Sequence, residues 1–186
     1  MIDIKPSMAQ IKVHDKMFGP FLSEQDIQQQ VKKIADAINS DYAGLRPMFI
    51  AILNGSFMFA SDLFKYLTID AEICFIKLAS YKGTTSSGQV ITAIGLDVDI
   101  IGKDIIILED IVDTGKTLNE FLPKLLHHQP ASMKIAALLH KPEAVKFPIR
   151  IDYLGFSIPN KFVVGYGLDY DGLGRNLKEI YQLVEV

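Results

Sequence analysis

Carboxylate and hydroxyl side chains are gathered in one short stretch of this 186-residue chain, directly after four branched apolar residues. The stretch contains Glu109, Asp110, Asp113, Thr114, Gly115, Lys116 and Thr117. Carboxylates accept hydrogen bonds from sugar hydroxyls and ligate hard cations, whereas threonine hydroxyls and the N–H groups of a turn into a helix can surround a phosphate. A ribose 5-phosphate needs both kinds of partner, so the stretch predicts a site for a phosphorylated sugar.

The end of this stretch also matches part of a nucleotide-binding P-loop, because Gly115, Lys116 and Thr117 fit the last three positions of that motif. The motif requires a glycine at the position of Asp110, whose carboxylate would repel the phosphates that the loop must hold. We therefore reject the P-loop interpretation. Taken alone, the segment is also compatible with an ordinary strand–helix junction capped by Asp113 or a threonine.

Polar residues follow two further apolar runs. Asn54 and Gly55 come after Met48–Leu53, and Lys141 comes after Ile135–Leu139 and a histidine. In open α/β sheets, ligands bind at the carboxyl ends of the strands, so we expect these residues to lie near the acidic stretch. The alternatives are a helix cap for Asn54 and a solvated surface position for Lys141.

Alternating helical and strand patterns place these residues in an α/β fold. Helices are expected from Ser23 to about Ser40, over residues 57–67, and from Gly115 to His128, with a bend or an early stop at Pro123. Strands are expected at Met48–Leu53, Ile73–Tyr81, Gln89–Leu96, Asp104–Leu108, Ala131–Leu139, Arg150–Phe156 and Phe162–Val164. The pattern predicts one domain over residues 1–186, built on a mostly parallel, twisted sheet flanked by helices.

Composition excludes several other classes of protein. The chain is 49% hydrophobic with a net charge of -3, which argues against disorder and against a general attraction to nucleic acid. The single cysteine, Cys74, excludes a disulfide scaffold, and the four histidines lack the spacing of a metal site. No apolar run approaches the ~20 residues of a membrane helix, and Met1–Gln10 lacks a signal-peptide core, so a cytoplasmic protein is expected.

The acidic stretch also resembles a known family motif. Leu108–Thr117 is similar to the 5-phosphoribosyl-1-pyrophosphate signature of the type I phosphoribosyltransferases, and the resemblance runs from about Phe49 to Tyr181. Within that family, the chain looks most like the hypoxanthine-guanine phosphoribosyltransferases. Besides the signature, the segments that carry this likeness are Leu53–Gly55, Ser80-Tyr81, Lys161–Tyr166 and Leu168–Tyr170.

The resemblance implies an enzyme of purine salvage. It would transfer the phosphoribosyl group from 5-phosphoribosyl-1-pyrophosphate to N9 of hypoxanthine or guanine, giving IMP or GMP and pyrophosphate. The resemblance also implies a Mg²⁺ cofactor, a homo-oligomer (dimer or tetramer) and a small base-binding hood. A flexible lid hairpin is implied as well, with its loop running from Tyr81 to Gly88.

Roles of individual residues follow from the same resemblance. Asp113 would act as general acid or base at N7 of the purine, beside a ribose held by Glu109 and Asp110 directly or through a metal. The 5-phosphate would be bound by Thr114, Gly115, Lys116 and Thr117, the pyrophosphate by Asn54, Gly55, Ser80, Tyr81 and Arg175, and the purine by Lys141, Phe162, Val163 and Asp169. Asp169 would also lie near a second Mg²⁺. Lys161 would be structural, near the sugar or the pyrophosphate.

The chain departs from the family at Asn54, where a lysine is usual, in a turn that often contains a non-proline cis peptide. Affinity for the donor or for pyrophosphate, or coupling between subunits, can therefore differ from the family norm. Two alternative functions stay open. One is a non-catalytic regulator of the same fold that binds nucleic acid, which the net charge disfavours. The other is a transferase with a different base preference, such as xanthine or a pyrimidine.

Overall fold

The computed structural model describes residues 9–80, 90–94 and 99–184. Within these residues, a six-stranded sheet has the order β5-β4-β3-β6-β7-β8. Its strands are β3 (Met48–Leu53), β4 (Glu72–Ser80), β5 (Val90–Ile94), β6 (Asp104–Val112), β7 (Ser132–His140) and β8 (Tyr153–Ser157). Neighbouring strands pair in parallel except β5, which is antiparallel to β4. The predicted mostly parallel sheet is confirmed.

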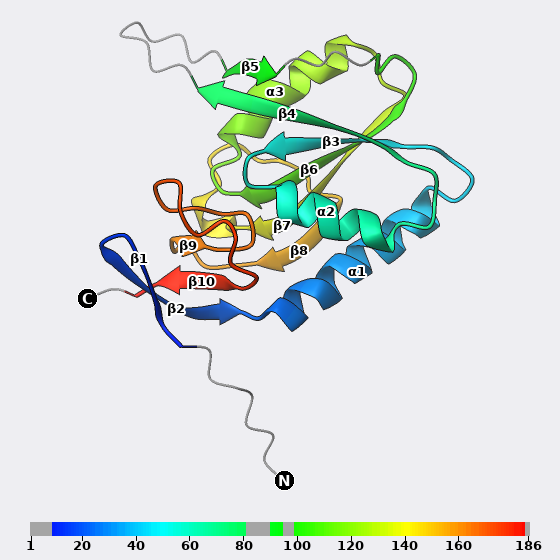
Figure 1. The fold of residues 1–186 in the computed structure, drawn as a ribbon. Helices are drawn as coiled ribbons and strands as arrows, with labels where there is room; N and C mark the ends of the chain where they lie inside the picture. Colours follow the sequence, from blue (N-terminus) through cyan, green and yellow to red (C-terminus); the bar gives the residue numbers. More distant parts are fainter. Residues whose placement is uncertain (1–8, 81–89, 95–98, 185–186) are drawn as a thin grey trace, which may run out of the picture.

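Helices cover both faces of this sheet, with α1 (Glu24–Asp41) and α2 (Phe57–Tyr66) on one face and α3 (Lys116–His127) on the other (Figure 1). The first two helices share a core with Phe49 and Leu108, whereas α3 packs with Ile50 and Ile107. Because both faces are buried, the central strands are apolar at successive positions rather than at alternate ones. Ser23 caps α1 as predicted, and its Oγ accepts a hydrogen bond from the N–H of Asp26.

A second, antiparallel sheet lies beside the carboxyl ends of the central strands (Figure 1). It consists of β1 (Ile11–Val13), β2 (Lys16–Leu22), β10 (Ile180–Leu183) and β9 (Val163–Val164), in that order. Its position matches the expected hood. Of its strands, only β9 was anticipated from the sequence, because β1, β2 and β10 lack a strong alternating pattern and pair segments from opposite ends of the chain.

Several boundaries differ from those that the sequence predicts. Strand β6 does not end at Leu108 but continues to Val112, because β7 supplies pairing partners as far as Val112 and His140. Helix α3 does not stop at Pro123, because Leu125 beyond the proline is buried in the same core as the first turns of the helix. The last strand of the sheet, β8, begins at Tyr153 rather than Arg150.

Two further expectations are confirmed, namely the antiparallel strand pair and the packing of the single cysteine. Strands β4 and β5 form the expected antiparallel pair, whereas the loop from Tyr81 to Gly88 lies outside the described residues. Cys74 packs against the core on the α3 side, and burial raises the pKa of its thiol. None of the helices in the described part of the chain combines the length and apolar character needed to cross a membrane.

Candidate active site

Three adjacent parallel strands, β3, β6 and β7, end at the same edge of the sheet and bring Asn54, Asp113 and Lys141 to it. The backbone N–H of Lys141 donates to the carbonyl of Val112 at 3.0 Å, which fixes the start of the segment after β7 against the end of β6. The side chain of Lys141 then reaches Asp113, with Nζ 3.1 Å from Oδ2. The prediction that these strand ends lie together is therefore confirmed.

The Asp113–Lys141 ion pair joins a buried cation to an accessible anion. The Lys141 side chain is 8% exposed, whereas that of Asp113 is 45% exposed. A buried ammonium group is stable only with a counter-charge, and Asp113 supplies it here. The arrangement leaves part of the Asp113 carboxylate open to a ligand, beside a donor that points into the same space. It can therefore present one acceptor and one donor to the edge of a planar heterocycle.

Glu109 and Asp110 precede Asp113 in the sequence and belong to the last part of strand β6. Burial and the neighbouring Asp110 charge raise the pKa of Glu109 well above its usual range. Burial also raises the pKa of Asp110 to about 6, although its backbone hydrogen bonds and Arg175 favour the charged form. Oε2 of Glu109 is buried without a hydrogen-bond partner among the described residues. An unpaired acceptor of this kind fits a hydroxyl donor or a hard cation.

The described residues contain no group of three or more His, Cys, Asp or Glu side chains placed to hold a metal by themselves. Mg²⁺ is commonly bound by one or two carboxylates together with substrate phosphates and water, so such a group is not required. The chemistry of Glu109 and Asp110 therefore fits a magnesium ion shared with a phosphorylated ligand.

Gly55 lies directly against the carboxylate of Asp110. A Cβ atom at Gly55 would overlap that carboxylate, and one at Gly167, where φ is +96°, would overlap the carbonyl oxygen of Gly55. The turn after β3 is thus enclosed between β6 and the segment after β9. The Leu53–Asn54 peptide bond in this turn is cis. The N-cap position of α2 falls on Ser56 rather than on Asn54.

The turn between β6 and α3 exposes the N-terminus of that helix. Gly115 takes a left-handed conformation at the N-cap, with φ of 77°, and its Cα lies against the carbonyl oxygen of Phe147. The carbonyl of Thr114 accepts hydrogen bonds from the N–H groups of Lys146 and Phe147, both at 3.0 Å. Lys116 and Thr117 are exposed in the first turn of α3. The N–H of Lys116 donates to Oγ1 of Thr114 at 3.3 Å. Backbone N–H groups at a helix N-terminus can bind a phosphate, which is the role that the sequence predicts for this turn.

The segment after β9 carries the remaining predicted residues. Phe162 is 44% exposed, and its ring lies edge-on to Tyr170 at 5.8 Å and tilted against Phe18 at 6.2 Å. Val163 is buried in β9. Phe18 belongs to the N-terminal hairpin, which no motif marks, so sequence reasoning missed its contribution to this aromatic group.

Asp169 and Arg175 are paired with each other. Nη2 of Arg175 lies 2.7 Å from Oδ1 of Asp169, and its Nη1 donates to the carbonyl of Gly167 at 2.7 Å. Both charges act on Asp110, where Arg175 lowers and Asp169 raises the pKa. They therefore lie close to the acidic end of β6. Of the other predicted residues, Ser80 ends β4, Tyr81 lies outside the described residues, and Lys161 lines a cavity of about 360 Å³ beside β2 and β10.

Comparison with known proteins gives one consistent result. A family model described as the phosphoribosyl transferase domain matches residues 21–171. A hypoxanthine-guanine phosphoribosyltransferase from Lactococcus lactis is 43% identical over 157 residues, which cover 84% of this chain and 85% of the relative. The crystal structure of such an enzyme from Bacillus anthracis aligns with a TM-score of 0.84 at 40% identity, covering 89% of this chain and 98% of the other.

A hypoxanthine phosphoribosyl transferase structure from Trypanosoma cruzi shows the same likeness. It aligns with a TM-score of 0.85 at 37% identity and covers 94% of this chain and 95% of the other. Both the sequence and the arrangement of the elements are thus shared over nearly the whole chain. The chain therefore belongs to the phosphoribosyltransferase family and, within it, to the hypoxanthine-guanine phosphoribosyltransferases.

Proposed function

We propose that the protein transfers the 5-phosphoribosyl group from 5-phosphoribosyl-1-pyrophosphate to N9 of hypoxanthine or guanine and releases pyrophosphate. The observation that carries this proposal is the Asp113–Lys141 pair, at 3.1 Å, beside the buried acidic end of β6. A 6-oxopurine offers an N7 and an oxygen at C6 on one edge, which match one group that exchanges a proton and one that donates a hydrogen bond.

In this mechanism Asp113 takes or returns the proton at N7, and Lys141 donates to the 6-oxo group. The ammonium group of Lys141 can rotate from Asp113 towards the base, because it already lies beside the Asp113 carboxylate that would contact N7. Phe162 offers its exposed ring face for stacking, and the backbone of Val163 meets the edge of the base. Asp169 completes the purine site in this proposal.

The phosphoribosyl donor occupies the acidic end of β6 and the two adjoining turns. Glu109 and Asp110 accept hydrogen bonds from the ribose hydroxyls, and residues Thr114–Thr117 hold the 5-phosphate. In this proposal the pyrophosphate is bound by Asn54, Gly55, Ser80, Tyr81 and Arg175. Glu109, Asp110 and Asp169 would hold Mg²⁺ together with the donor, and the bound ion would supply charge neutralisation for the leaving pyrophosphate. Asn54 supplies no positive charge, so we expect weaker affinity for pyrophosphate than a lysine at this position would give.

The wider setting is also part of the proposal. We place the protein in the cytoplasm as one phosphoribosyltransferase domain over residues 1–186, acting as a homo-oligomer on small-molecule substrates. Exposed apolar side chains on β4 and at the start of α2, namely Phe57, Ile73 and Phe75, support association with a second copy.

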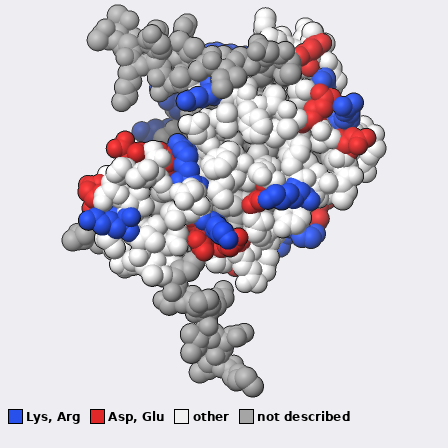
Figure 2. Space-filling view, in the orientation of Figure 1, with Lys and Arg blue, Asp and Glu red and all other residues white. Residues whose placement is uncertain are grey.

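On the face that Figure 2 shows, Lys and Arg are interspersed with Asp and Glu around a broad uncharged area. The described residues on that face form no basic stripe of the kind that binds nucleic acid.

A spectrophotometric assay tests the proposal. The purified protein is incubated with the donor and Mg²⁺, and with hypoxanthine, guanine, xanthine, adenine or uracil in separate reactions. Turnover of hypoxanthine or guanine is expected, and faster turnover of xanthine would change the base assignment. Binding of nucleic acid at physiological salt without turnover of any base would instead support the regulator.

A further inference from the structure

The tip of the turn after β9 is buried, although turn tips usually face solvent. Gly165 and Leu168 exchange backbone hydrogen bonds at 3.0 Å, which closes a four-residue turn. The two central residues, Tyr166 and Gly167, have positive φ angles of 47° and 96°. Tyr166 is nevertheless 1% exposed and among the largest fully buried side chains. A bulky residue holds such a conformation only where the surrounding structure fixes it, and such positions cluster at functional sites.

Hydrogen bonds hold both the backbone and the side chain of this tyrosine. Its N–H donates to the carbonyl of Leu177 at 2.9 Å. Its hydroxyl donates to Oδ2 of Asp62 in α2 at 2.7 Å. Asp62 is in turn held by Lys65, at 2.7 Å, and by Gln28 of α1. Burial opposes ionisation, but the hydrogen bonds from Lys65, Tyr166 and Gln28 hold the pKa of the Asp62 carboxyl below its ordinary value. Asp62 therefore offers a charged, immobilised acceptor, on which a hydrogen bond is stronger than on a neutral one.

The same turn contacts residues of the proposed site. The Cα of Gly167 lies against the carbonyl of Gly55. The N–H of Gly167 donates to the carbonyl of Arg175, and the Arg175 guanidinium donates to the carbonyl of Gly167 and pairs with Asp169. Gly167, the residue after Tyr166, thus lies between the turn after β3 and the Asp169–Arg175 pair. No described hydrogen bond links Tyr166 to Asp113 or Lys141, which are held by the central sheet.

We propose that Tyr166 is a positioning residue, whose hydrogen bond to Asp62 holds the Gly165–Leu168 turn at the separation from Gly55 that substrate binding needs. This inference rests on the proposed function. Because the turn contacts the proposed binding residues Gly55 and Arg175, whereas Asp113 and Lys141 follow strands of the central sheet, loss of the bond should weaken binding rather than slow the chemical step.

The test begins with Tyr166→Phe, which removes only the hydroxyl. We expect the KM values for the purine and for the donor to rise about tenfold, with kcat within about threefold of wild type, as loss of a hydrogen bond to a charged group predicts. The dissociation constant of IMP, measured by titration calorimetry, should rise by a similar factor. Asp62→Asn should shift the same constants in the same direction, and the double variant should be no worse than Tyr166→Phe, because both changes remove one interaction.

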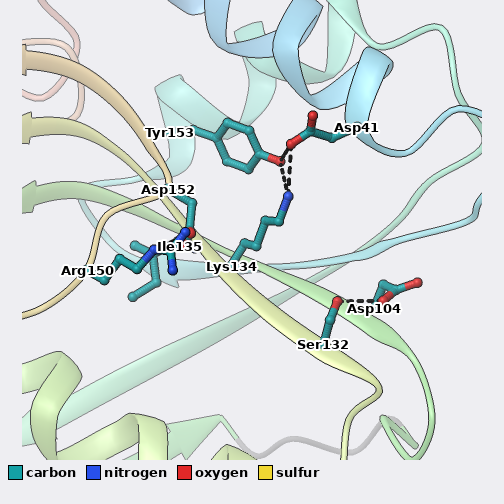
Figure 3. Close-up of polar contacts among 8 residues, drawn as sticks. All are labelled: Asp41, Asp104, Ser132, Lys134, Ile135, Arg150, Asp152 and Tyr153. Carbon is teal, nitrogen blue, oxygen red and sulfur yellow. Dashed lines mark hydrogen bonds and ion pairs between the residues drawn. The ribbon is translucent and has the colours of Figure 1, made fainter.

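Tyr153→Phe is the matched control. Figure 3 shows Tyr153 in a bond of the same kind, with its hydroxyl donating to Asp41 at 2.6 Å beside Lys134. Tyr153 is 7% exposed and begins β8, at the end of the sheet opposite the proposed site. This variant should lose thermal stability, as measured by Tm, yet keep both KM values within about twofold of wild type.

Each outcome bears on the inference. Unchanged KM values in Tyr166→Phe, an equal rise in Tyr153→Phe, or additive effects of Tyr166→Phe and Asp62→Asn would overturn it. If Tyr166→Phe does not fold, unchanged constants in Asp62→Asn overturn it and raised constants support it. If the wild-type protein turns over none of the bases, the proposed function is overturned and the positioning role falls with it. If the wild type is active and Tyr166→Phe has the same constants, only the positioning role is overturned.

Discussion

Asp113 has two roles, as the counter-charge of Lys141 and as the proposed acid–base group. Its carboxylate is 45% exposed while Lys141 is almost fully covered, so the pair is open on the side of Asp113 alone. A residue that only balanced a buried lysine would not need this exposure. Substitution can separate the two tasks, because asparagine keeps an oxygen that accepts from Lys141 but cannot take a proton.

Asp113→Asn should therefore lower kcat by about 10²–10⁴, the usual effect of removing a positioned acid–base group. The remaining acceptor oxygen should leave folding little affected. Steady-state kinetics and thermal unfolding of the same preparation check both parts. Full turnover would remove Asp113 from catalysis, and an unchanged rate with lower stability would make it a structural residue.

Gly55→Ala tests the close approach of the turn after β3 to Asp110. The added Cβ would overlap the Asp110 carboxylate and force it to move, whereas Gly55 needs no positive φ that alanine would resist. We expect kcat/KM to fall about 10–100-fold, as for a small misplacement within a site. Gly19→Ala is the control, since its Cβ would make only ordinary contact with Val184. An equal effect of both substitutions would contradict this explanation.

The types of residue in the candidate site were predicted better than the contacts between their side chains. The types and order of residues from Glu109 to Thr117 indicated a sugar and a phosphate site, and the structure brings Asp113 and Lys141 together as expected. The Asp169–Arg175 pair could not be foreseen, because two charges in a glycine-rich loop can meet only if the turns between them close.

At the scale of elements, α3 shows how packing overrides local preference. Pro123 lies inside the helix and is exposed, yet the helix continues to His127 because Leu118, Phe121 and Leu125 are all buried in one core. A proline in this position removes one backbone hydrogen bond and costs free energy that this burial offsets.

Pro123→Ala should restore the hydrogen bond to the carbonyl of Asn119 and raise the free energy of unfolding by about 1–3 kcal/mol. Urea denaturation of the two proteins measures the difference. The Michaelis constants should not change, because the substitution is on the exposed side of the helix. A lower stability of the variant would mean that the proline is favourable at this position.

At the scale of the whole molecule, one polar connection between the helices and the segment after β9 consists of Asp62, Tyr166 and Gln28. The folded state lowers the pKa of Asp62, so its contribution to stability is present above the ordinary value of 3.8 and is lost as the pH falls through the lower folded-state value. Wild type should therefore be more stable than Asp62→Asn near neutral pH, and the difference should vanish at acid pH. Urea unfolding of both proteins over that range tests this, and a difference that persists in acid would exclude the charge as its source.

The amino-acid sequence alone determined the class of fold and the chemistry at the ends of the central strands. The apolar runs of β3, β6 and β7 are buried, and the polar residues of the site follow each run directly in the sequence. Both features can therefore be recognised from the local sequence. The second sheet, the aromatic group around Phe162 and the contact between Tyr166 and Asp62 were decided only by tertiary structure. Each of these joins segments more than one hundred residues apart, and nothing in the local pattern of either segment identifies its partner.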